Sequence, residues 1–225
     1  AVGRIWINGV FPTLAIVATL GLVTAMRFVG EGRMRRDAER QRGNLARYVP
    51  ARAADTLAGA DRPYAADRVQ QAAVMFVDMV GFTAIGEHLA PGEQLALLRA
   101  FHGRVEATIT AHGGIIDKFV GDGASASFGT FDPHIEDAAR ALRCARALAA
   151  NIAGWSSTRA AAGQSGLRVS IGLHYGPVIV GEIGGARQQQ FTVSGDTVNL
   201  ASRLEALTRD LGVVIVASDT LVDCA

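Results

Sequence analysis

The stretch IIDKFVGDGASASF, residues 115–128, decides the fold of the chain. It consists of two strand-like runs, Ile115–Val120 and Ala124–Phe128, on either side of Gly121-Asp122-Gly123. Two such runs joined by a short turn of Asp and Gly residues predict a tight β-hairpin. We therefore expect a hairpin at the centre of the domain, with Asp122 at its tip.

Helical and strand patterns continue outward from this hairpin in both directions. Up to the hairpin we expect a strand at Val74–Asp78 and a helix that opens at Pro91 and closes at Gly113. After the hairpin we expect a helix from about Ile135 to Ile152, a strand at Leu167–His174, a turn at Gly176–Pro177 and strands at Val178–Val180 and Phe191–Val193. The last two expected elements are a helix at Thr197–Leu211 and a strand at Val213–Val216. Strand, helix, hairpin, helix, strand is the order of a ferredoxin-like α+β domain.

The composition narrows the class of protein. The chain has 225 residues, of which 49% are hydrophobic and 19% charged, and a formal net charge of +1. A charge so close to neutral argues against a nucleic acid partner. The two cysteines, Cys144 and Cys224, have no metal-ligand spacing, and they suit a reducing compartment.

An apolar segment precedes the domain. No residue from Ile5 to Met26 is charged, and Arg4 and Arg27 flank the run. About 20 apolar residues cross a bilayer as a helix, so residues 1–27 predict a transmembrane helix with its flank. Arginines crowd the side that follows, which places the domain in the cytoplasm by the positive-inside rule. The alternative is a buried helix of a larger domain.

Residues 28–69 predict a helical linker between the membrane and the domain. Met34, Ala38, Gln41, Leu45 and Tyr48 alternate at spacings of four and three, which is the pattern of a weak heptad seam. The other residues of this segment are polar, and a single solvated helix explains the pattern equally well. Residues 70–225 form the domain.

Several polar residues stand where chemistry is expected. A carboxylate at a strand end, Asp78, and another at a hairpin tip, Asp122, suit a magnesium ion that also binds phosphates, although Asp is common in turns. Arg168 is a candidate for phosphate contact. Asn199 and Arg203 share one face of the last helix, and we expect Leu200, Leu204 and Leu207 to face the core. No P-loop pattern is present.

The combination of three motifs carries more information than any single residue. FVDMVGFT (76–83), KFVGDG (118–123) and FTVSGDTVNLASRLE (191–205) closely resemble the signatures of class III adenylate and guanylate cyclases, in the family's order and at about its spacing. The resemblance covers roughly Ala73 to Ser218. It implies a ferredoxin-like class III cyclase domain.

The resemblance implies a role for each matched position. Asp78 and Asp122 match the aspartates that bind two Mg²⁺ or Mn²⁺ ions per site, with the backbone carbonyl of Met79 as a further ligand. Asn199 is similar to the residue that orients the ribose, and Arg203 to the one that stabilises the pentavalent phosphate. In such enzymes the aspartates come from one subunit of a homodimer and the other residues from its partner.

The same resemblance implies the substrate. Lys118 and Thr192 match the pair that recognises the purine, and Lys118 can donate to the unprotonated N1 of adenine. Relatives that use GTP typically carry an acidic residue there, so ATP is expected to give cyclic AMP. The remaining substrate-binding candidates are Phe82, Thr83 and Arg168.

The sequence departs from the family pattern at three places. Ser125 and Ser127 are more polar than the usual residues after the hairpin turn, which we expect to loosen it. Ser170 stands where many relatives have a phosphate-contacting arginine. The chain stops at Ala225, before the family's late lysine. The alternatives are a guanylate cyclase and a catalytically silent module for dimerisation or nucleotide sensing. A diguanylate cyclase is excluded because its Gly-Gly-Asp/Glu-Glu-Phe turn is missing.

Overall fold

The computed structural model describes residues 67–185 and 188–225. The predicted membrane helix at Ile5–Met26 and nearly all of the predicted linker therefore lie outside the described residues. Within the described part of the chain, no helix is long and apolar enough to cross a membrane. The elements are β1 (Arg68–Val80), α3 (Phe82–Gly86), α4 (Pro91–Ala111), β2 (Ile115–Val120), β3 (Gly123–Phe128), α5 (Asp137–Ala161), β4 (Arg168–Gly185), β5 (Gln188–Ser194), α6 (Asp196–Leu211), β6 (Ile215–Ala217) and α7 (Asp219–Asp223).

The strands form one sheet in the order β2-β3-β1-β4-β5, with β6 pairing with β4 in parallel. Along the order β2-β3-β1-β4-β5, each strand is antiparallel to the next. This order confirms the predicted ferredoxin-like arrangement. The hairpin is also confirmed, because Val120 pairs with Gly123 across a two-residue turn in which Gly121 has φ 59°. A positive φ of this kind suits glycine, which has no Cβ to clash.

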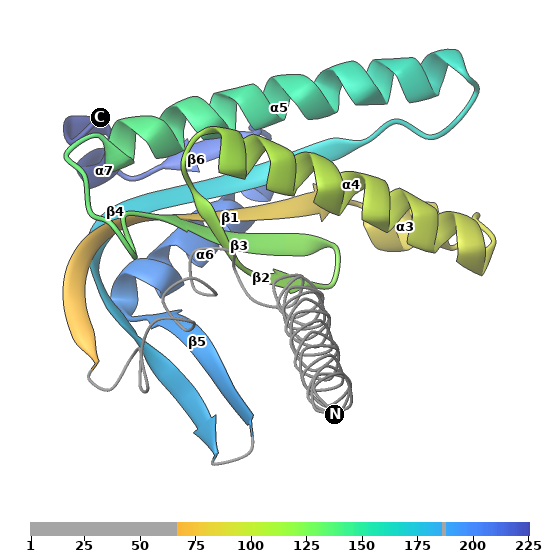
Figure 1. The fold of residues 1–225 in the computed structure, drawn as a ribbon. Coiled ribbons are helices and arrows are strands. Elements are labelled where there is room, and N and C mark those ends of the chain that lie inside the picture. The colour runs from red at the N-terminus through yellow and green to blue at the C-terminus, as the bar shows by residue number, and fades with distance from the viewer. Residues whose placement is uncertain (1–66, 186–187) are drawn as a thin grey trace, which may run out of the picture. The chain divides into compact units, whose positions relative to one another are not determined.

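The two faces of the sheet are covered differently (Figure 1). Helices α4 and α5 lie on one face, where alternate residues of β1 and β3 meet the apolar stripe of each helix in the main core. Phe101, Val105 and Ile109 of α4 and Leu148 of α5 are fully buried there. Helix α6 lies on the other face over a smaller cluster that includes Val74, Val178, Val180 and Ala201.

Strand β4 is longer than predicted. It runs unbroken through Gly176 and Pro177, where the sequence predicts a turn, and Pro177 stays in register opposite Gln71 of β1. The turn prediction was wrong because this stretch of β4 has a strand on one side only. Pairing with β6 ends at Leu173 and pairing with β5 begins at Ile179. A proline, which lacks an N–H group, is tolerated at such an edge.

The buried side of α6 also differs from the prediction. The buried residues are Thr197, Ala201, Glu205 and Thr208, whereas Leu200 and Leu207 are 37% and 39% exposed. Helix α6 passes so close to β4 that a Cβ added at Gly172 would lie 2.1 Å from the Glu205 backbone nitrogen. The backbone of α6 at Ala201 and Glu205 thus faces β4, and Leu200 and Leu207 lie on more exposed sides of the helix.

Candidate active site

Asp78 and Asp122 lie next to each other at one end of the sheet. Asp78 is near the end of β1 and pairs with Gly123, the residue that follows Asp122. A Cβ at Gly123 would lie 2.9 Å from Asp78 Oδ1, so glycine allows the hairpin to close against this carboxylate. Partial burial raises the pKa of Asp78, and the negative charges of Asp122 and Glu205 raise it further. Two carboxylates in mutual repulsion favour a bound cation.

Helix α6 supplies a cation to this pair. Arg209 Nη2 donates to Asp78 Oδ2 at 2.7 Å and to Glu205 Oε1 at 3.1 Å. The Ser170 hydroxyl donates to the same Glu205 oxygen. The sequence analysis missed Arg209, although its i, i+4 spacing from Glu205 was a signal for an ion pair on one helix face. We name Asp78, Asp122, Glu205 and Arg209 the carboxylate cluster.

Gly172 brings the carboxylate cluster together. It lies two residues after Ser170 on β4, on the sheet face that α6 covers, and it touches the α6 backbone at Ala201 and Glu205. The contact fixes Glu205 above Ser170, and Ser170 is paired with Asp78 in the neighbouring strand. Because α6 passes so close to Gly172, the Glu205 side chain is held beside the end of β1 with little freedom to move.

Asn199 and Arg203 lie elsewhere, in a pocket near the beginning of α6. This pocket has a volume of about 680 Å³. Arg203 and Glu205 are two positions apart, which is about 200° around a helix, so they point to opposite sides. Neither Asp78 nor Asp122 lines the pocket. Its lining residues are Val69, His174, Pro177, Val178, Ile179, Gly195, Asp196, Thr197, Asn199, Leu200 and Arg203. One chain therefore holds the predicted site residues in two separate places.

The two predicted purine residues come from opposite ends of the strand order. Lys118 is exposed on β2, and Thr192 is half-buried on β5, where it pairs with Gly181. The sheet curves enough for β2 and β5 to contact each other. Beside Thr192, Phe191 stacks on Phe131 with ring centroids 4.7 Å apart.

The arrangement of strands, hairpin and α6 is that of a known enzyme family. The sequence profile of the adenylate and guanylate cyclase catalytic domain matches residues 64–222. The chain belongs to this family. Adenylate cyclase 1 of Rhizobium meliloti is 35% identical over 153 residues, which are 68% of this chain and 23% of that relative, so the match spans about a quarter of the relative's length.

Solved structures agree on the domain. A bacterial light-regulated adenylyl cyclase superposes with a TM-score of 0.75 at 27% identity, over 84% of this chain and 56% of that one. A guanylyl cyclase superposes with a TM-score of 0.64 at 30% identity, over 70% of this chain and 79% of that one. Class III cyclase domains bind nucleotide substrates and act as dimers. These likenesses include both purine specificities.

The cyclase domain places the other candidates around the carboxylate cluster. The Met79 side chain is buried in the core, which leaves only its backbone for a ligand. Phe82 and Thr83 open α3 directly after Gly81, which has φ 78°. Arg168 is exposed at the start of β4 and pairs with Val80, two steps beyond the Asp78–Ser170 pair. Within the described part of the chain, Asp78 pairs with Arg209, and no hydrogen bond or ion pair joins it to Arg168.

The two serines after the hairpin turn have a partner that the sequence analysis missed. The hydroxyls of Ser125 and Ser127 donate to the carboxylate of Asp117 at 3.4 and 2.8 Å. Enclosure of this carboxyl group raises its pKa to about 7, and the two serine hydrogen bonds oppose the rise. These contacts tie β2 to β3 directly under Lys118, so the serines join the two strands of the hairpin.

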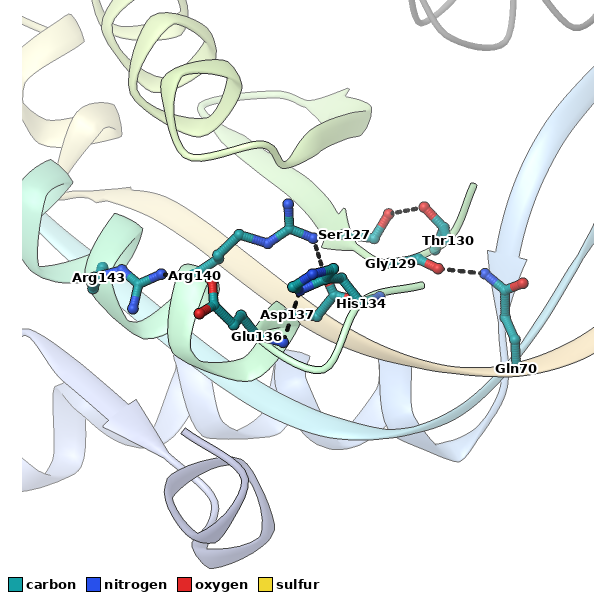
Figure 2. A network of polar contacts seen from close by, with 9 residues as sticks. All are labelled: Gln70, Ser127, Gly129, Thr130, His134, Glu136, Asp137, Arg140 and Arg143. Atoms are coloured by element: carbon teal, nitrogen blue, oxygen red, sulfur yellow. Dashed lines mark hydrogen bonds and ion pairs between the residues drawn. The ribbon is translucent and has the colours of Figure 1, made fainter. Parts of the chain in front are cut away.

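The end of the hairpin is held by the network in Figure 2. Ser127 and Thr130 share a hydrogen bond of 2.9 Å, and Gln70 of β1 donates to the Gly129 carbonyl at 2.6 Å. Beyond them, the buried Asp137 accepts from the His134 backbone and from Arg140. The strand that follows Asp122 is thus anchored at its far end to β1, and the Asp137 contacts hold the start of α5.

The donor set fits divalent cations that are shared with a substrate. Among residues 67–185 and 188–225, no group of three or more His, Cys, Asp or Glu side chains could hold a metal ion. Two carboxylates remain, Asp78 and Asp122. Magnesium commonly binds through one or two carboxylates together with substrate phosphates, so this pair suits a metal-nucleotide complex.

Proposed function

We propose that this domain converts ATP to 3′,5′-cyclic AMP and pyrophosphate at a site shared between two copies of the chain. One observation supports this most directly. The chain carries four residues that the matched motifs assign to one reaction, yet it holds them apart, with Asp78 and Asp122 at the strand ends and Asn199 and Arg203 in the α6 pocket. A two-fold axis that sets one copy's carboxylates opposite the other's pocket would complete two identical sites.

Each residue has a defined task in the proposed reaction. Asp78 and Asp122 would hold two Mg²⁺ or Mn²⁺ ions, with the Met79 carbonyl. When bound, the ions supply Lewis acidity for the 3′-hydroxyl and for the triphosphate. The 3′-oxygen forms a bond to the α-phosphorus, the bond to pyrophosphate breaks with its electron pair on the departing oxygen, and the hydroxyl proton passes to water. The Asn199 amide orients the ribose, and the Arg203 guanidinium stabilises the negative charge that grows on the transferring phosphoryl group.

The proposal assigns ATP rather than GTP as the substrate because of Lys118. This residue is the only lysine in a chain with 22 basic residues, so the other 21 are arginines. Its ammonium group can donate to the adenine N1, which is an acceptor, whereas guanine carries a proton at N1 and would repel it. Thr192 can accept from the exocyclic amine of adenine.

A cyclase assay of the purified full-length protein tests the function. We expect cyclic AMP from ATP with Mg²⁺ or Mn²⁺, and far less cyclic GMP from GTP. Turnover of neither nucleotide, with a folded dimer in hand, would support the silent module instead. A preference for GTP would contradict the role of Lys118.

We further propose that residues 5–26 anchor the protein in the cell membrane and that the domain lies in the cytoplasm. Uncharged residues between Arg4 and Arg27, and the arginines that follow, support this topology. Protease added to sealed cells should spare the domain, and protease added to broken cells should cut it. Cleavage from the outside would contradict the topology, and recovery of the full-length protein in the soluble fraction would contradict the anchor.

A further inference from the structure

The guanidinium of Arg209 lies inside the proposed metal site. Its Nη2 atom contacts Asp78 Oδ2 at 2.7 Å, and the Arg209 side chain is still 48% exposed. Both of its hydrogen bonds use Nη2. A guanidinium has five N–H donors, and within residues 67–185 and 188–225 the donors on Nε and Nη1 have no hydrogen-bond partner, so they can serve a ligand.

Glu205 holds this guanidinium independently of Asp78. The Glu205 carboxylate is nearly buried, accepts from Ser170, and bonds Arg209 at 3.1 Å across one turn of α6. When Asp78 gives its oxygens to a divalent cation, the contact between Arg209 and Glu205 can persist. The positive group then stays at the mouth of the site, beside the ions, with several donors unused.

The charge of the carboxylate cluster shows what kind of ligand Arg209 would meet. Asp78, Asp122 and Glu205 bring three carboxylates together, and among the described residues Arg209 is the only cation whose charge acts on Asp78. Two divalent ions would leave this cluster with a positive excess. A polyanion would balance that excess, and phosphate oxygens match the planar fork of an arginine.

We propose that Arg209 is a further substrate-binding residue, which contacts the triphosphate from the same subunit that supplies Asp78 and Asp122. This rests on the proposed function, because it takes the substrate to be a nucleoside triphosphate. It also gives α6 two roles. The beginning of the helix serves one site of the dimer through Asn199 and Arg203, and its last turn serves the other site through Arg209.

Binding of a nucleotide that cannot cyclise tests the proposal without turnover. The full-length protein is titrated with 3′-deoxy-ATP and Mg²⁺ in a calorimeter, as the parent, Arg209→Gln and Arg209→Lys. Loss of a charge-assisted hydrogen bond predicts a Kd about tenfold to a hundredfold weaker for Arg209→Gln. The lysine variant should recover part of the affinity, since it keeps the charge but not the fork. Arg143→Gln, which removes another ion-paired helix arginine far from the site, should match the parent.

Titration with Mn²⁺ alone distinguishes a role of Arg209 in binding the triphosphate from one in which it only occupies Asp78. If Arg209 only blocks Asp78, its removal tightens Mn²⁺ binding and leaves the affinity for 3′-deoxy-ATP unchanged, which would overturn the proposal.

Subunit mixing gives a second test. Arg209→Gln mixed with Arg203→Ala should recover activity, whereas Arg209→Gln mixed with Asp122→Ala should not. The reverse pattern would place Arg209 in the partner's site. A parent that binds 3′-deoxy-ATP but makes no cyclic AMP would count against the proposed function alone.

Discussion

The two ends of α6 differ in how complete their surroundings are. The last turn lies in the carboxylate cluster, where Arg209, Glu205 and Asp78 are bonded to one another within one chain. The first turns carry Asn199 and Arg203, which line an open pocket and whose side chains make no hydrogen bond to another described residue. The fold of a single chain thus builds the half of the site that would hold cations. The half that would orient the nucleotide stays open for a ligand and a second subunit.

Removal of one carboxylate should have the largest effect, and it tests the half of the site that contains Asp78 and Asp122. Asp78→Asn and Asp122→Asn keep the size of the side chain and remove the charge that a cation needs. We expect cyclase activity to fall about a thousandfold, as when a preorganised electrostatic group is lost, while circular dichroism stays unchanged. Asp210→Asn, an exposed neighbour of Arg209, is the control and should keep full activity. Activity within tenfold of the parent in either variant would contradict the metal assignment.

The contact between α6 and β4 links the two halves, and Gly172→Ala should break it. The added methyl group would lie 2.1 Å from the Glu205 nitrogen and 2.4 Å from the Ala201 oxygen, both backbone atoms that cannot rotate away. We expect a loss of about 3 kcal/mol in unfolding free energy, typical of severe overpacking. Urea unfolding measures it. Gly103→Ala, with nothing near the added carbon, should not destabilise the protein, and equal effects in both variants would refute the close approach.

The preference for ATP over GTP tests the half of the site that would orient the nucleotide. Lys118→Glu replaces a donor by an acceptor, which suits the N1–H of guanine. We expect the ratio of kcat/KM for ATP to that for GTP to fall about a hundredfold. Initial rates with each nucleotide measure the ratio. An unchanged ratio, with overall activity retained, would remove Lys118 from the purine site.

Much of this organisation follows from short-range patterns in the sequence. The hairpin, the order of the elements and the position of Asp122 depend on turn residues and periodicity, which act locally. The unbroken course of β4 and the buried side of α6 do not follow from local patterns. They depend on which strands flank Pro177 and on how closely α6 passes over Gly172. Arg209 was missed for the same reason. It follows Asp78 by 131 positions, and only the tertiary fold brings the two together.

The smallest expected effect concerns the base of the hairpin. Asp117 ordinarily has a pKa of 3.8, and burial raises it to about 7 in the folded chain. The folded state then holds a proton that the unfolded state has lost, so stability that is present below pH 4 declines as the pH rises to about 7. Relative to Asp117→Asn, the parent should lose about 1 kcal/mol or more between pH 5 and pH 8. Urea unfolding at the two pH values measures this, and a constant difference would contradict the raised pKa.

Subunit mixing tests the central claim, which is that each site takes its carboxylates from one chain and its Asn199 and Arg203 from another. Asp122→Ala and Arg203→Ala homodimers should each be inactive, because both of their sites carry a lesion. Random pairing makes half of the dimers mixed, each with one intact site of two, so about a quarter of the parental activity should return. No recovery, with heterodimers demonstrated by differently tagged chains, would show that each chain builds its site alone.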